Sequence, residues 1–263
     1  MATLQSEALI LRSVEFGESD RILHLLLPDQ GRLTVIAKGA RRSVKRFPGT
    51  LDLFNHLKVQ IEGHRRSSMA RLTQARLLGV FPALRADPLR FALGCYLLEI
   101  LDRLAPEGGV RREMRRLFAF VMSALGWLDA RPPDLAQRTI LEMRLLDALG
   151  VRPELRACVR CKREVAGEGE LGFHVAEGGP LCSSCGLPQD SPIGVHLGTL
   201  RALEQGLRLD LNVIDRLVLG PLALEEARRI VTRFQHFHVG VNLQSERFLD
   251  RLFRESSEFP GRA

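Results

Sequence analysis

The sequence predicts an α+β protein, with a five-stranded β-barrel at the N-terminus and a C-terminal α-helical domain that carries an inserted four-cysteine module. Up to residue 80, apolar and polar residues alternate, which is the period of strands with one buried face. After residue 81, apolar residues recur every three to four positions, which is the period of helices. Two pairs of closely spaced cysteines interrupt the helical part. We therefore expect a barrel over residues 1–81, a helical domain over 82–263, and an insert over 155–190.

The barrel is expected to contain five short strands. Leu33 and Val35, which alternate with Arg32 and Thr34, give the clearest strand pattern. Turn-forming residues separate the segments, for example at 28–31. Five strands in 80 residues suit a small closed sheet, and the OB-type barrel is the candidate of that size. The expected strands cover residues 8–15, 21–27, 32–38, 53–61 and 69–76.

The helical part opens at Asp87 and Pro88, an N-cap residue followed by proline at the first helical position. Gly150 and Pro153 end the third amphipathic segment. Because each segment has one apolar face, the first three helices are expected to share a core. The glycine-rich stretch between the cysteine pairs is typical of a short β-hairpin. The expected helices cover residues 87–104, 117–128, 134–149, 197–207, 222–237 and 244–253.

The composition excludes several classes of protein. Hydrophobic residues make up 45% of the chain and charged residues 26%, which is ordinary for a folded protein. The mean hydropathy of -0.02 and the lack of an apolar run near the roughly 18 residues of a spanning helix argue against a membrane protein. Residues 1–11 do not resemble a signal peptide, so we expect a cytoplasmic protein. In that reducing compartment, five cysteines indicate metal binding or burial, and not disulfides.

The charge is unevenly distributed along the chain. The formal net charge is +7 and the isoelectric point about 9.7, which favours a polyanionic partner. The first 80 residues hold thirteen basic and seven acidic side chains, a net of +6. The other 183 residues hold 25 basic and 24 acidic side chains. This segregation predicts a binding face on the N-terminal domain.

The four clustered cysteines predict a zinc site. Cys158 and Cys161 form one Cys-x-x-Cys pair, and Cys182 and Cys185 form another after twenty intervening residues. Two such pairs complete a tetrahedral four-sulfur shell, which leaves no open position for water, so we predict one structural Zn²⁺. Four unrelated buried cysteines would not explain the matched spacing. His174 could replace a sulfur, but four cysteines suffice.

The insert is expected to stabilise the protein and not to bind nucleic acid. Zinc ribbons can contact nucleic acid, but the charges of this insert are balanced. Its basic residues Arg160, Lys162 and Arg163 are offset by the acidic residues Glu164, Glu168, Glu170 and Glu177.

A basic run between residues 38 and 49 is the second functional candidate. It holds five cations and no acid, in an expected strand-to-strand loop. Charge runs are usually solvated loops, but the +6 of this domain favours contact with a phosphate backbone without base preference. Phe47 in the run could either stack on a base or anchor its loop. The predicted DNA-binding residues are Arg32, Lys38, Arg41, Arg42, Lys45, Arg46, Arg65 and Arg66.

No motif predicts catalysis. The sequence has no P-loop, G-x-S-x-G, H-E-x-x-H or G-x-G-x-x-G pattern, so we predict no catalytic residue and no enzyme. Cys95 lies among leucines on an expected helix and is interpreted as a core residue. His236 and His238 offer only a weak indication of a second metal site.

Five short segments follow one another along the chain at residues 7–12, 16–21, 37–42, 51–54 and 243–249, and the four-cysteine insert lies between the last two. In this ordered set, which spans almost the whole chain, the sequence resembles the RecO family of bacterial recombination mediators. The resemblance implies an OB domain followed by a helical domain with a zinc module. The family's basic OB surface corresponds to Lys38, Arg41 and Arg42, whereas the other five predicted DNA-binding residues follow from charge alone.

The resemblance also implies a function. Such proteins are non-enzymatic mediators of RecF-pathway DNA repair, which bind single- and double-stranded DNA and anneal complementary strands. With the partner RecR they help RecA replace single-strand-binding protein on DNA, which implies a cytoplasmic, nucleoid-associated protein. Arg228, Arg229 and Arg233 could contact single-strand-binding protein, but a solvated helix face is the simpler interpretation.

Two alternatives belong to other functional classes. A zinc-ribbon transcription or RNA-binding factor would read base edges and bind with sequence specificity, whereas a mediator would bind without sequence preference and anneal strands. A nuclease would need a carboxylate cluster for two-metal chemistry, and the sequence offers none.

Overall fold

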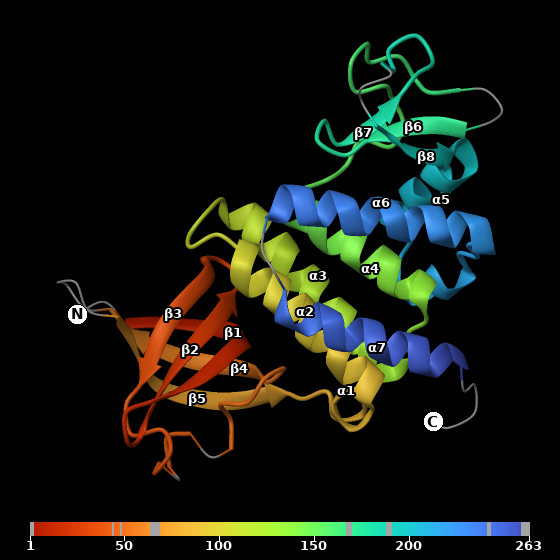
Figure 1. Ribbon diagram of the computed structural model, residues 1–263. Coiled ribbons are helices and arrows are strands. Elements are labelled where there is room, and N and C mark those ends of the chain that lie inside the picture. The colour runs from red at the N-terminus through yellow and green to blue at the C-terminus, as the bar shows by residue number, and fades with distance from the viewer. Residues whose placement is uncertain are drawn as a thin grey trace. The chain divides into compact units, whose positions relative to one another are not determined.

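The structure is a computed structural model that describes residues 3–43, 45–47, 49–63, 69–166, 170–187, 191–240 and 243–258 (Figure 1). The predicted α+β class is confirmed, with a five-stranded N-terminal sheet, C-terminal helices and a four-cysteine cluster. The chain forms two compact units. Unit 1 comprises Met1–Pro132 and Leu243–Ala263, and unit 2 comprises Pro133–Asn242. The predicted domain boundaries at residues 81, 155 and 190 stay predictions.

Unit 1 begins with five strands that form a closed barrel in the order β1-β2-β3-β5-β4. Strand β1 pairs antiparallel with both β2 and β4, and β3 pairs in parallel with β5. β1 starts five residues before the predicted position, because Leu4 and Ser6 pair with Ile61 and Val59 of β4. The strands are β1 (Thr3–Phe16), β2 (Asp20–Leu27), β3 (Gly31–Ala37), β4 (His56–Glu62) and β5 (Ala70–Gly79).

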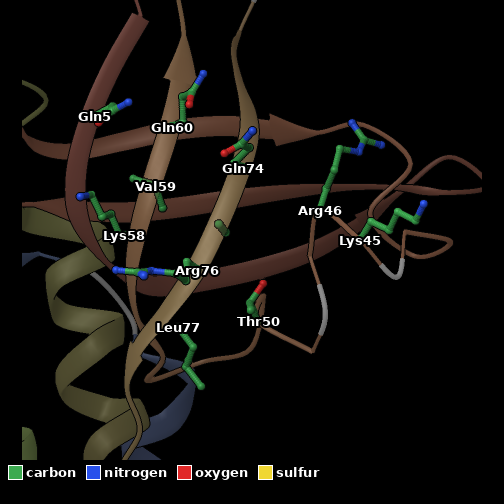
Figure 2. Close-up of a pocket in the computed structure, with 11 residues that line it drawn as sticks. Gln5, Lys45, Arg46, Thr50, Lys58, Val59, Gln60, Gln74, Arg76 and Leu77 are labelled. Atoms are coloured by element: carbon green, nitrogen blue, oxygen red, sulfur yellow. The ribbon is translucent and has the colours of Figure 1, made fainter.

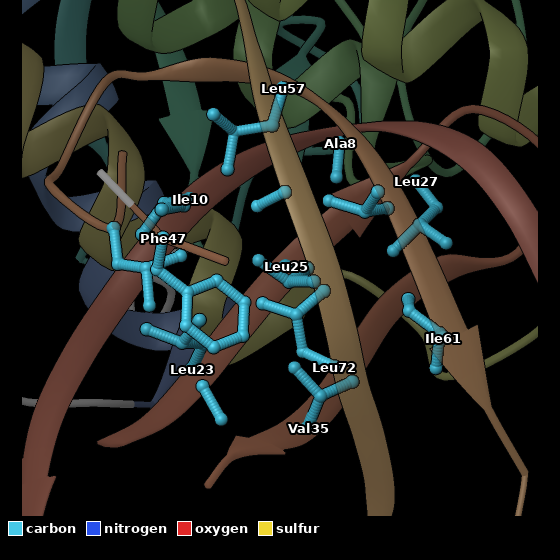
Figure 3. Close-up of a cluster of buried hydrophobic side chains, with 14 residues drawn as sticks. Ala8, Ile10, Leu23, Leu25, Leu27, Val35, Phe47, Leu57, Ile61 and Leu72 are labelled. Atoms are coloured by element: carbon cyan, nitrogen blue, oxygen red, sulfur yellow. The ribbon is translucent and has the colours of Figure 1, made fainter. Parts of the chain in front are cut away.

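The barrel interior is filled by the apolar residues of the alternating pattern (Figure 3). Strand residues such as Leu25, Val35 and Leu57 are fully buried. Phe47 comes from the loop between β3 and β4, and its ring lies in the same cluster with only 4% of the residue exposed. Of the two interpretations of Phe47, the structure therefore supports the anchor, because a ring buried in the core cannot stack on a base.

The described part of unit 1 also contains four helices. Asp87 caps α2 as predicted, since its carboxylate accepts a hydrogen bond of 2.8 Å from the backbone N–H of Arg90. Helix α7 packs against α2, and the Glu99 carboxylate accepts hydrogen bonds from the backbone N–H groups of Gln244 and Ser245, 2.9 Å each. The short α1 was not predicted, because five residues are too few to reveal a period. The helices are α1 (Pro82–Ala86), α2 (Pro88–Leu104), α3 (Arg111–Ala130) and α7 (Gln244–Glu258).

Unit 2 combines helices with a three-stranded sheet in the order β7-β6-β8. The expected hairpin between the cysteine pairs is formed by β6 and β7, whereas β8 was not predicted. Helix α4 packs against α5 and α6. The elements are α4 (Leu135–Ala148), β6 (Glu170–His174), β7 (Gly179–Leu181), β8 (Ile193–His196), α5 (Leu197–Arg208), the 3₁₀ helix η2 (Leu211–Arg216) and α6 (Pro221–Val239).

The expected three-helix core is divided. Helices α2 and α3 belong to unit 1 and α4 belongs to unit 2. An amphipathic pattern shows which face of a helix is buried, but it does not show which partner covers that face. Within the part of the chain that the structure describes, no helix combines the length and the apolar character required to cross a bilayer.

Candidate functional site

The four cysteines come together in unit 2, as two backbone knuckles. In the first, the Lys162 N–H donates to the carbonyl of Cys158 at 2.9 Å, and Lys162 has a left-handed φ of 63°. In the second, the Cys185 N–H donates to the carbonyl of Cys182 at 3.0 Å. Each knuckle folds a Cys-x-x-Cys pair so that both sulfurs face the same point.

The sulfur positions fit a tetrahedral metal ion. The four Sγ atoms of Cys158, Cys161, Cys182 and Cys185 all lie within 4.8 Å of one another, and those of Cys161 and Cys182 are 3.7 Å apart. Zinc–sulfur bonds of about 2.3 Å in a tetrahedron place sulfurs about 3.8 Å apart. His174 lies outside this group, and its Nδ1 accepts a hydrogen bond from the backbone N–H of Glu177 at 3.0 Å. All four predicted ligands are thus placed to share one ion.

Neighbouring side chains hold the two knuckles together. The Arg160 guanidinium donates to the carbonyl of Cys185 at 2.7 Å and to the Glu177 carboxylate at 2.7 Å. The Ser184 hydroxyl lies 3.2 Å from the Cys182 sulfur, and this hydrogen bond is the main reason why the pKa of Cys182 is lowered to about 6. The pKa of Cys185 is in turn raised to about 12, first by its hydrogen bond with Cys182, so the two thiols of this knuckle do not ionise independently.

The predicted cations of unit 1 fall into two groups with different surroundings. The first group is the basic turn, residues 38–43, which follows β3. Lys38 Nζ lies 2.7 Å from Asp20, Arg41 lies 3.2 Å from Glu15, and Arg42 lies 3.8 Å from Glu18. Each of the three cations that the family resemblance singles out therefore has an acidic neighbour.

Asp20 fixes the shape of the basic turn. Its carboxylate accepts hydrogen bonds from Lys38 Nζ and from the backbone N–H of Gly39, which has a left-handed φ of 65°. The hydrogen bond from Lys38, followed by that from Gly39, holds the pKa of Asp20 below its usual value. Lys38 thus has a structural partner within the barrel.

Arg32 forms ion pairs with an acidic residue of α2 and with one in the loop that follows α2. Its guanidinium lies 2.6 Å from Glu107 and 3.6 Å from Asp102, whose side chain is 7% exposed. Asp102 also contacts His24 and Arg12. The predicted role of Arg32 in DNA binding stays a prediction, but these ion pairs already neutralise its charge.

The second group of cations borders a groove on the outside of the barrel (Figure 2). We call it the basic groove; it has a volume of 770 Å³ and runs along β4 and β5 beside the loop that carries Lys45 and Arg46. Sequence reasoning identified these two residues but missed Lys58 and Arg76 on the strands. Their signal was present in the outward positions of two alternating strands, next to buried Val59 and Ala75. The described lining residues of the groove include no acidic side chain.

The remaining candidates are less informative. Arg65 and Arg66 lie outside the described residues. Within the described chain, the cysteine cluster is the only group of three or more metal-ligating side chains, so His236 and His238 are not part of a second one. Arg228 does not lie on a solvated face, because it is 16% exposed and pairs with buried Glu142.

Two family models match this chain. A model described as Recombination protein O N terminal matches residues 1–81, and one described as Recombination protein O C terminal matches residues 85–247. The chain belongs to the recombination protein O family. The family resemblance inferred from the sequence is thereby confirmed.

Curated relatives of the recombination protein O family match over nearly their full length. A protein of Anaeromyxobacter dehalogenans (strain 2CP-C) named DNA repair protein RecO is 36% identical over 96% of this chain and 98% of the relative. Proteins of the same name are 32% identical in Moorella thermoacetica, over 98% of this chain and 94% of the relative, and 30% identical in Symbiobacterium thermophilum, over 96% and 98%.

Proposed function

We propose that this protein acts in DNA repair and recombination as a DNA-binding mediator. The observation that carries the proposal is the match of both family models over nearly the whole chain, together with relatives named for DNA repair. In this proposal, the barrel binds single- and double-stranded DNA through its phosphates, and the bound strands are annealed. With RecR, the protein would help RecA replace single-strand-binding protein, at the nucleoid in the cytoplasm.

The barrel supports a role in DNA binding in two ways. Its five strands close on themselves, which agrees with an OB-type fold, an architecture that binds oligonucleotides. Its excess charge of +6 lies within the first 80 residues. Because Phe47 is buried and is not available for stacking, contacts to phosphates should dominate, and binding should not depend on base sequence.

The cysteine cluster supports a structural role for the metal. Zn²⁺ held by Cys158, Cys161, Cys182 and Cys185 would have no open position for water, so it would supply folding free energy and no hydrolytic chemistry. We propose a mediator without enzymatic activity, in keeping with a sequence that offers no catalytic motif. Annealing should need neither magnesium nor nucleotide.

A fluorescence annealing assay tests this function. Two complementary labelled strands are mixed with the protein, with and without single-strand-binding protein as a coat, in the presence of EDTA. We expect annealing to accelerate at protein concentrations that saturate the DNA, for strand pairs of unrelated sequence. Binding restricted to one sequence, without annealing, would instead indicate a zinc-ribbon transcription or RNA-binding factor.

A further inference from the structure

The basic groove contains a pair of like charges that do not stabilise the fold. Lys58 of β4 and Arg76 of β5 are directly opposite each other in the antiparallel pairing, and both are exposed. Figure 2 shows the two side chains next to each other on their strands. Like charges in directly opposite positions destabilise a sheet. Neither residue forms an ion pair with any described residue of the chain.

The nearest acidic residue in this row forms no ion pair with either cation. Glu7 of β1 is the cross-strand neighbour of Lys58 on its other side. The Glu7 carboxylate, however, is bound to His56 at 2.9 Å. Two adjacent cations that lower the stability of their own sheet are expected where an anion binds between or above them.

Two more cations line the groove from the loop. Lys45 and Arg46 precede Phe47, whose buried ring fixes this part of the loop to the barrel core. The backbone carbonyl of Arg46 accepts a hydrogen bond of 3.5 Å from the N–H of Ala75 on β5. The Arg46 guanidinium donates to the carbonyl of Lys38 at 2.8 Å and lies 5.3 Å from the centre of the Phe47 ring. The core thus holds two cations at the rim of the groove, opposite the strand pair.

A row of amides continues the groove along the strands. Gln5, Gln60 and Gln74 are cross-strand neighbours on β1, β4 and β5. This row lies two residues from Lys58 and Arg76, about 7 Å along the strands. Amide side chains can donate to phosphate oxygens and can also accept hydrogen bonds from sugars or bases. The described lining includes no aromatic ring, so the groove offers charge and hydrogen bonds but no stacking surface.

From this arrangement we propose that the basic groove is the main binding site for the phosphate backbone of a single nucleic-acid strand. This inference rests on the proposed function and gives it a location. The strand lies along β4 and β5, with Lys58 and Arg76 on one side and Lys45 and Arg46 on the other. The basic turn contributes less, because its cations Lys38, Arg41 and Arg42 already have acidic neighbours.

The test compares two variants that each lose one lysine and one arginine. Lys58→Gln/Arg76→Gln changes the groove, and Lys38→Gln/Arg42→Gln is the matched change in the basic turn. Affinity for a fluorescein-labelled oligothymidylate is measured by anisotropy across a salt series. On single strands each phosphate contact contributes about 0.7 to the slope of log K against log salt, so losing two contacts should reduce the slope by about 1.4. If the two proteins bind equally at 1 M salt, the groove variant should bind about 25-fold more weakly than the wild type at 0.1 M salt. The turn variant should lose less than about fivefold.

Thermal unfolding adds a second readout. Because the groove variant removes a repulsion within the sheet, its melting temperature should be equal to or higher than that of the wild type. An equal loss of affinity in both variants, or an unchanged affinity in the groove variant, would overturn the groove assignment while leaving DNA binding intact. A wild-type protein that bound no oligothymidylate at low salt would overturn the proposed function, and the groove assignment with it.

Discussion

The basic turn and the basic groove belong to the same barrel, but their cations differ in what faces them. In the turn, Lys38 lies 2.7 Å from Asp20, and Arg41 lies 3.2 Å from Glu15. In the groove, Lys58 and Arg76 face each other. The turn has the higher density of charge in the sequence, whereas Lys58 and Arg76 of the groove form no ion pair with a described residue. The comparison teaches that the availability of a cation depends on its partners, which a charge count does not reveal.

Charge reversal should separate the two regions most strongly. Lys58→Glu/Arg76→Glu removes two attractions to the DNA phosphates and adds two repulsions. Neither residue has an ion pair with a described residue that the change would break. We expect single-strand DNA affinity at 0.1 M salt to fall on the order of 500-fold. Arg41→Glu/Arg42→Glu should cost only about tenfold. Anisotropy at a fixed salt concentration, after confirming unchanged melting temperatures, checks both values, and a larger loss from the turn variant would reverse the comparison.

Neutralising the acidic neighbours of the basic turn should instead increase DNA affinity. Glu15→Gln/Glu18→Gln frees Arg41 and Arg42 from their neighbours, so DNA binding should become about threefold to fivefold tighter. The matched control is Glu164→Gln/Glu225→Gln, which raises the net charge equally through exposed acids of unit 2. If both variants bind more tightly by the same factor, net charge alone decides affinity and the partners are irrelevant.

The sequence predicted the local features well and the long-range ones poorly. Strand and helix periods, the Asp87 cap and the two Cys-x-x-Cys pairs depend on residues a few positions apart, so they could be predicted. The position of Lys58 opposite Arg76 depends on the register between β4 and β5. The neutralisation of Arg32 depends on contacts some seventy residues away. No local pattern carries that information.

Arg32 provides a third and smaller effect on DNA binding. Since its charge is balanced by Asp102 and Glu107, Arg32→Gln should change DNA affinity by less than about twofold. It should lower the free energy of unfolding by about 1–2 kcal/mol, because the buried Asp102 carboxylate loses a partner. Urea denaturation and anisotropy on the same preparation measure the two quantities. A normal stability with a tenfold loss of affinity would place Arg32 in the DNA interface after all.

The cysteine module should affect DNA affinity least. Metal analysis is expected to return about one zinc per chain, and Cys158→Ser should lower the melting temperature by about 10 °C, since a closed zinc site contributes several kcal/mol to folding. Below that transition, DNA affinity should stay within about twofold of the wild type, because the proposed binding face belongs to unit 1. A metal-free protein with full thermal stability would contradict the structural role of the ion.

The chain's four lysines allow the most direct test of where DNA binds. Lys38 reports on the basic turn, Lys45 and Lys58 on the basic groove, and Lys162 on the cysteine module of unit 2. Acetylation rates are measured by mass spectrometry with and without saturating oligothymidylate, and each lysine is compared with itself, which cancels the effect of Asp20 on Lys38. We predict strong protection of Lys45 and Lys58, weaker protection of Lys38 and none of Lys162. Protection of Lys38 or Lys162 with Lys58 still fully reactive would contradict this account.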